Sequence, residues 1–220
     1  MLKRRAVAAA ALVAVASLVV APSLASTSEA GVRPCIHGYS YAGYASRDGV
    51  TGVAASIKAV RSPSVESGHA AAWVGVGGIH EGPGGANEWL QAGVAAFPGV
   101  GLRVYVESFS RGERRFVDLA HAVVGRRYRV RILETGRDVW HAMVDGRTVG
   151  SPAYLPTTGG SWRAVATAES WAAGHAACNR YAYRFDGVSV SRATRWGALA
   201  DAEAVGAGVR RDRSGFLATS

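Results

Sequence analysis

Two polar side chains stand where apolar alternation would otherwise continue, and their chemistries complement each other. Gln91 lies within NEWLQAGVAAF, residues 87–97, and Glu169 lies within AVATAESW, residues 164–171. A glutamate can act as general base on a water, and a glutamine NH₂ can donate to the oxygen of a tetrahedral intermediate. If the fold brings both groups to one water, they form a hydrolytic pair. Taken alone, each residue is also typical of the solvated face of a sheet.

The patterns of other hydrolytic sites are missing. His80-Glu81 lacks the second histidine that the HExxH zinc motif places four residues after the first. No GxSxG nucleophile elbow occurs, nor does the E-x-D-x-E run of sandwich-fold glucanases. We therefore expect no metal and no cofactor. The other histidines are isolated along the chain: His37, His69, His121, His141 and His175.

The first residues predict export from the cell. Lys3, Arg4 and Arg5 precede an apolar run of 15 residues, 6–20, and small residues before position 26 suit cleavage after Ala25. This is the pattern of a secretory signal peptide. The run is shorter than the about 20 residues of a membrane span, so an uncleaved anchor is the weaker alternative. We expect a secreted protein with no stable membrane insertion after cleavage.

Export also bears on the cysteines. Cys35 and Cys178 are the only two in the chain, and an even count in an exported protein favours a disulfide. The alternative is a pair of free thiols. A bridge would tie the start of the mature domain to a point near its end, and it makes a cysteine nucleophile unfavourable.

Charge gives no sign of a nucleic-acid partner. Without residues 1–25 the chain has 22 Lys and Arg against 16 Asp and Glu, a net charge of +6. The charges are scattered, and Lys58 is the only lysine after the signal. A nucleic-acid interface usually gathers basic residues on one face. We expect a monomer that binds no nucleic acid.

Short segments with period-two alternation follow one another and predict an all-β fold. Tyr128, Val130 and Ile132 alternate with arginines, as in an antiparallel strand with one wet face. Asp145-Gly146 indicates a tight hairpin. Many short strands predict an antiparallel β-sandwich of two packed sheets, of the jelly-roll type. The predicted strands are 49–60, 69–78, 87–97, 102–110, 115–123, 127–135, 138–146, 162–171 and 180–190.

These features divide the chain into one main domain and flanking segments. The signal peptide is followed by a leader with the first strand region. The C-terminal part has no clear apolar stripe, and we expect it to be mobile. The predicted parts are 1–25 (signal), 26–48 (leader and first strand region), 49–196 (sandwich) and 197–220 (tail).

Four motifs in order resemble the eqolisins, a family of glutamic peptidases. They are AWVGVGG at 72–78, LQAGV at 90–94, YVE at 105–107 and ATAE at 166–169. The family shows W-V-G-I, then L-Q-T-G-V, then a strand rich in tyrosine and glutamate, then W-I-V-E. The resemblance covers roughly residues 50–190. It departs from the pattern at Gly77 and Ala95, where the family tends to have acidic residues.

The resemblance implies a fold and a site. The fold is a concanavalin-A-like sandwich of two seven-stranded sheets, with a Gln/Glu dyad on the concave face that cuts polypeptides at acid pH. By this likeness Gln91 is the amide partner, Glu169 is the general base, and Trp73 lines the cleft. Tyr105 and Glu107 share a face, and we assign them to the same cleft.

Two other functions fit the same fold. A non-catalytic sandwich could bind a carbohydrate or a protein on its concave face, since one fold hosts many functions. A glucanase-like hydrolase is the third possibility. The arrangement of Gln91 and Glu169 in space separates these functions from the peptidase.

Overall fold

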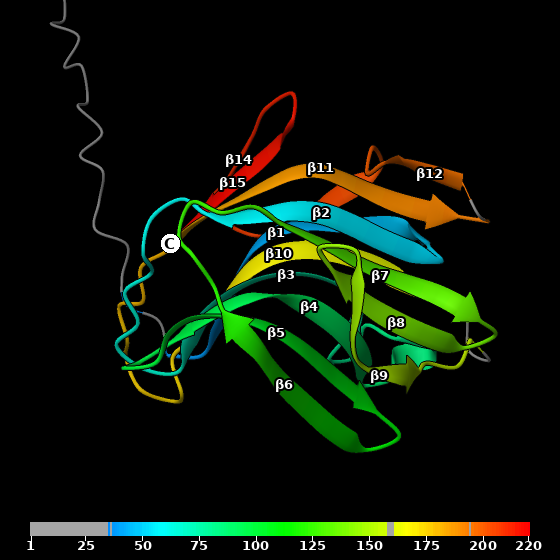
Figure 1. Ribbon diagram of the computed structural model, residues 1–220, viewed down its shortest axis with the longest axis horizontal. Helices are drawn as coiled ribbons and strands as arrows, with labels where there is room; N and C mark the ends of the chain where they lie inside the picture. The colour runs from blue at the N-terminus through cyan, green and yellow to red at the C-terminus, as the bar shows by residue number, and fades with distance from the viewer. Residues whose placement is uncertain (1–34, 36, 158–160, 194) are drawn as a thin grey trace, which may run out of the picture. The chain divides into compact units, whose positions relative to one another are not determined.

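The computed structural model describes residues 35, 37–157, 161–193 and 195–220. These residues form two antiparallel sheets that pack against each other, which confirms the predicted β-sandwich (Figure 1). One short 3₁₀ turn, Pro83–Gly85, connects two strands. No helix in the described part of the chain is long and apolar enough to cross a membrane.

The first sheet has seven strands in the order β13-β1-β10-β3-β4-β5-β6. Its central strand, β3, pairs with β10 on one side and with β4 on the other. The strands are β1 (Tyr39–Gly49), β3 (His69–Gly78), β4 (Glu88–Phe97), β5 (Gly101–Ser110), β6 (Glu113–His121), β10 (Arg163–Trp171) and β13 (Ala202–Gly206).

The second sheet follows the order β14-β15-β11-β2-β7-β8-β9, and β12 pairs with β11 outside this path. With β12 it has eight strands, one more than the seven expected from the resemblance. The strands are β2 (Gly52–Ala59), β7 (Tyr128–Gly136), β8 (Val139–Val144), β9 (Arg147–Tyr154), β11 (Ala182–Arg192), β12 (Arg195–Ala198), β14 (Val209–Arg211) and β15 (Gly215–Thr219).

The core lies between the sheets and follows the period-two pattern. In β7, Tyr128, Val130 and Ile132 are buried, while Arg129 and Arg131 are exposed. Successive strand residues point to opposite faces, so one apolar set from each strand enters the core. The largest side chains in the core include Trp140, Trp162, Tyr181, Tyr183 and Phe185.

The predicted strands agree with the structure, often to within one or two residues at each end. β3 has the predicted bounds, and β4, β5 and β10 each begin one residue away from theirs. The hairpin between β8 and β9 turns at Asp145 and Gly146, with φ angles of 50° and 83°. Positive φ at both positions is the geometry for which Asp-Gly is favoured.

The C-terminal segment 197–220 differs from the expected mobile tail. It contains β13, β14 and β15, and its first residues, 197–198, are the end of β12. β13 pairs with β1 at the edge of the first sheet, and β15 pairs with β11 in the second. The sandwich therefore does not end at residue 196. Short strands of three to five residues carry too little alternation to be seen in sequence, and pairing with a longer neighbour stabilises them.

A disulfide and the side chain of Asn179, the residue after Cys178, hold one end of the first sheet together. Cys35 and Cys178 form the predicted disulfide, with Cα atoms 4.5 Å apart. The buried Asn179 accepts a hydrogen bond from the backbone N–H of Glu66 at 2.9 Å. Its amide donates to the carbonyls of Ser67 and Trp171, at 2.8 and 3.2 Å. One side chain thus joins the start of β3 to the end of β10.

We expect Asn179→Ala to lower the free energy of unfolding by about 2–4 kcal/mol, because it leaves several buried backbone groups without partners. Urea unfolding measures this difference. Asn87→Ala is the matched control, since Asn87 is exposed and its side chain accepts one backbone hydrogen bond. The control should cost less than about 1 kcal/mol. Equal costs for the two variants would contradict a fastening role for Asn179.

Candidate active site

The outer face of the first sheet, which points away from the core, carries a cleft of about 670 Å³. β3 is the middle of this face. Ala72, Val74 and Val76 point into the core, so the alternate residues of the strand, Trp73 among them, point outward. Gly93 faces Trp73 on the neighbouring strand, and a Cβ there would lie 2.7 Å from the Cα of Trp73. Glycine is therefore required beside the indole.

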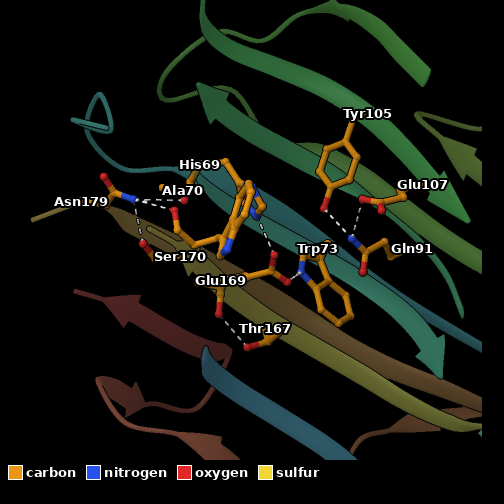
Figure 2. A network of polar contacts seen from close by, with 12 residues as sticks. His69, Ala70, Trp73, Gln91, Tyr105, Glu107, Thr167, Glu169, Ser170 and Asn179 are labelled. Carbon is orange, nitrogen blue, oxygen red and sulfur yellow. Dashed lines mark hydrogen bonds and ion pairs between the residues drawn. The ribbon is translucent and has the colours of Figure 1, made fainter. Parts of the chain in front are cut away.

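Glu169 reaches this face from β10, where it lies opposite Tyr41 on β1 and Ala71 on β3. Its carboxylate is held at both oxygens, as Figure 2 shows. The Nε2 atom of His69 lies 2.6 Å from Oε1, and the indole N–H of Trp73 donates to Oε2 at 3.1 Å. Glu169 is 7% exposed and lines the cleft. A water in the cleft can therefore reach a carboxylate whose orientation is fixed.

Gln91 reaches the same face from β4, opposite Gly75 on β3 and Glu107 on β5. Its Nε2 donates to the hydroxyl of Tyr105 at 3.3 Å and to Glu107 at 3.4 Å. Glu107 is buried, and the guanidinium of Arg114 holds its other oxygen at 2.6 Å. The carboxylate neighbour fixes which end of the amide is the NH₂, because only the nitrogen can donate to it. Both bonds from Gln91 are long for hydrogen bonds.

Gln91 and Glu169 line the same cleft but do not touch. Their partners on β3 are Gly75 and Ala71, with Trp73 at the outward-facing position between them. Four residues of strand correspond to about 13 Å along β3. Among the hydrogen bonds of the described residues none joins the two side chains, and each has its own partners (Figure 2). The shared water stays a prediction.

Trp73, Tyr105 and Glu107 all lie on the predicted face. Trp73 and Glu107 line the 670 Å³ cleft, and Tyr105 lines a smaller hollow beside it. His69 was not among the predicted site residues, because it is an isolated histidine in the sequence. His69 is the first residue of β3. It lies four residues before Trp73, an even spacing along the strand. Period-two alternation of this strand could have placed both side chains on one face.

The cleft also includes residues that sequence reasoning left unassigned. Tyr39 and Tyr41 come from β1, and Arg163 closes one end of the cleft with ion pairs to Glu81 and Glu203. Glu203 belongs to β13, so the C-terminal segment contributes a wall of the cleft. Arg163 thus links a loop, the central part of the sheet and its edge strand.

Burial and negative charge raise the pKa values of the tyrosines of the site. Burial raises the pKa of Tyr41 well above the usual phenol value, and the charge of Glu169 raises it further. The pKa of Tyr39 is raised by the same two causes. Burial also raises the pKa of Tyr105, with smaller contributions from Glu169 and Glu107. These phenols are therefore neutral hydrogen-bond donors at neutral and acid pH.

Comparisons with known proteins match this arrangement of strands. A crystal structure of scytalido-glutamic peptidase with a peptide-based transition state analog superposes with a TM-score of 0.58 at 16% identity. A second, with a transition state analog inhibitor, gives 0.58 at 14%. SCP-B, a member of the eqolisin family in complex with the tripeptide Ala-Ile-His, gives 0.52 at 15%. Each match covers 84% of this chain and 98% of the other.

This chain has the eqolisin fold. The finding confirms the fold that the four sequence motifs predicted. The structural likeness extends beyond residues 50–190, because the matched part is 84% of the chain. No model of a known protein family and no curated protein matches the sequence itself. The likeness to the eqolisins is therefore carried by the strands and by the short motifs on them.

The raised pKa of Tyr41 predicts how stability changes in alkali. The folded phenol stays neutral, while the phenol of the unfolded chain ionises near pH 10. The protein therefore keeps its full free energy of unfolding below pH 10 and loses part of it above pH 10. Tyr41→Phe cannot ionise, and we expect it to unfold at a higher pH than the wild type. Fluorescence followed from pH 8 to 12 measures the midpoint. A lower or unchanged midpoint, with equal urea stability at pH 7, would contradict this.

Proposed function

We propose that the protein is a secreted endopeptidase of the glutamic type, acting on polypeptides at acid pH through Gln91 and Glu169. The observation that carries the proposal is that an amide and a carboxylate line one cleft on the outer face of an eqolisin-like sandwich. Structural neighbours with this fold are glutamic peptidases. The disulfide between Cys35 and Cys178 supports an exported protein.

The carboxylate supplies the base. Glu169 takes a proton from a water in the cleft, and the water oxygen attacks the carbonyl carbon of the peptide bond. His69 and Trp73 hold the carboxylate in one orientation during this step. The proton on Glu169 then passes to the nitrogen of the leaving amine as the C–N bond breaks. Atoms balance, because one water is consumed and one carboxyl and one amine are released.

The amide stabilises the charge that develops on the carbonyl oxygen. The Nε2 hydrogens of Gln91 now make two long bonds, to Tyr105 and Glu107. A developing oxyanion is a stronger acceptor than a phenol oxygen, so it can replace Tyr105 without moving the amide far. Since the two groups do not touch, the water and the peptide carbonyl occupy the space between them.

One observation favours a second candidate function. The cleft also carries a row of aromatic side chains, among them Tyr39, Tyr41, Trp89 and Phe109. Trp89 and Phe109 stack with ring centroids 5.0 Å apart. A face of this kind suits a non-catalytic sandwich that binds a carbohydrate or a protein. Such a module would bind without cutting.

Activity of the mature protein on an unfolded protein, assayed from pH 2 to 7, tests the dyad. We expect Glu169→Gln to lower the rate by about 10²–10⁴-fold, because it removes the base. Gln91→Ala should cost about 10²–10³-fold. Glu113→Gln is the matched control, since Glu113 is an exposed glutamate paired with Arg115 outside the cleft. A wild type that cuts nothing, or a Glu169→Gln variant as active as the control, would refute the peptidase.

The contact between His69 and Glu169 predicts a separate effect. His69→Phe keeps an aromatic ring beside Phe97 and Trp171 but removes the donor to Glu169. We expect kcat to fall about tenfold to a hundredfold while KM changes little, because the carboxylate loses its fixed orientation. His69→Gln retains an N–H that reaches the carboxylate and should restore most of the rate. A rate that is kept in His69→Phe but lost in His69→Gln would mean that His69 acts only by packing.

A further inference from the structure

A second hollow, of about 390 Å³, lies beside the proposed dyad on the same face. Its floor is formed by Ala71 on β3 and Ala95 on β4, which are cross-strand partners. Both are 2% exposed, so only methyl groups separate the hollow from the sheet backbone. The next outward-facing residue of β3 is Trp73, and tryptophan has the largest side chain of all residues. The difference in size between the indole and the two methyl groups therefore creates the depth of the hollow.

The walls of the hollow are aromatic and partly open to solvent. Phe116 on β6 stacks on Tyr105 with centroids 5.3 Å apart and meets Phe97 edge-on at 5.9 Å. Phe116 is 44% exposed. Ala71, Ala95 and Tyr105 belong to an apolar cluster that is separate from the core between the sheets. Apolar surface gathered on one outer face in this way usually marks a binding site.

The rim of the hollow is polar and contains Gln91 of the proposed dyad and the histidine that contacts Glu169. His69, which holds Glu169, stands on one side. Gln91 and Glu107 stand on the other, with Arg114 bound to Glu107. An occupant must therefore be apolar in the hollow and polar at the rim. A residue of a peptide meets both needs, with its side chain inside and its backbone amide at the rim.

We propose that this hollow is a specificity subsite that receives an aromatic side chain of the substrate, next to the peptide bond that is cut. The inference rests on the proposed function and adds the class of substrate. The volume of about 390 Å³ is near the lower end of the range of ligand pockets, about 300–1,000 Å³, and it leaves room for an aromatic side chain. Aromatic walls favour an aromatic ring because rings gain from stacked and edge-on contacts.

The test begins with the bonds that the mature protein cuts in an unfolded protein, identified by mass spectrometry. We expect Phe, Tyr or Trp on one side of most cut bonds. Two peptides that differ only in Phe or Ala at that position should then differ at least about tenfold in kcat/KM. Random residues around the cut bonds, or equal values for the two peptides, would overturn the subsite.

Filling the hollow gives an independent readout. Ala95→Leu occupies the floor and should remove most of the advantage of the Phe peptide over the Ala peptide. Ala54→Leu is the matched control, because Ala54 lies on the outer face of the second sheet, far in the fold from the cleft. The control should keep the wild-type preference. An Ala95→Leu variant that also keeps it would overturn the assignment.

Binding separates failure of the subsite from failure of the peptidase. If the wild type cuts neither peptide, the same Phe and Ala peptides, labelled with a fluorophore, are titrated with Glu169→Gln protein. Binding of the Phe peptide at least about tenfold more tightly would retain the aromatic subsite in a protein that only binds. Equal affinities would overturn the subsite, whatever the outcome for catalysis.

Discussion

The pairing register of β3 with its two neighbours is the constraint on which the site depends. β3 places Ala71 opposite Glu169 and Gly75 opposite Gln91. Side chains alternate between the two faces of a strand, so a slip of one residue would turn every outward group into the core. The apolar set Ala72, Val74 and Val76 prevents this slip, because it would have to leave the core. Packing between the sheets therefore selects the residues that face the cleft.

A polar site on a sheet face requires that each buried polar group have a partner. Glu169 and Glu107 are both buried, and a buried charge without a partner is costly. His69 and Trp73 satisfy the first carboxylate, and Arg114 satisfies the second. His69 and Trp73 come from β3, between the strands of Glu169 and Gln91, and Arg114 comes from β6. Among the described residues, the side chains that hold these two carboxylates all belong to the first sheet.

The sequence predicted the long strands and the face of the site but not the edges or the partners. Long strands such as β3 and β7 show alternation over many residues, and this pattern is local. β13 lies in an alanine-rich segment that resembles a weak helix, and only pairing with β1 makes it a strand. The role of His69 depends on a contact with a residue 100 positions away. Such contacts follow from register, which no single segment encodes.

The two departures from the eqolisin pattern have different physical reasons. Gly77 has φ of 77°, and a Cβ there would lie 2.1 Å from the carbonyl oxygen of Glu88 and 2.7 Å from the ring of Trp162. An acidic side chain therefore cannot occupy this position in this backbone. Ala95 has an ordinary strand conformation, and its small side chain forms part of the floor of the hollow beside Gln91. Neither position can supply an acidic group here, and the two buried carboxylates of the cleft instead contact the guanidinium of Arg114 and the imidazole of His69. In this chain the carboxylates on this face are thus held by nitrogen donors of neighbouring side chains.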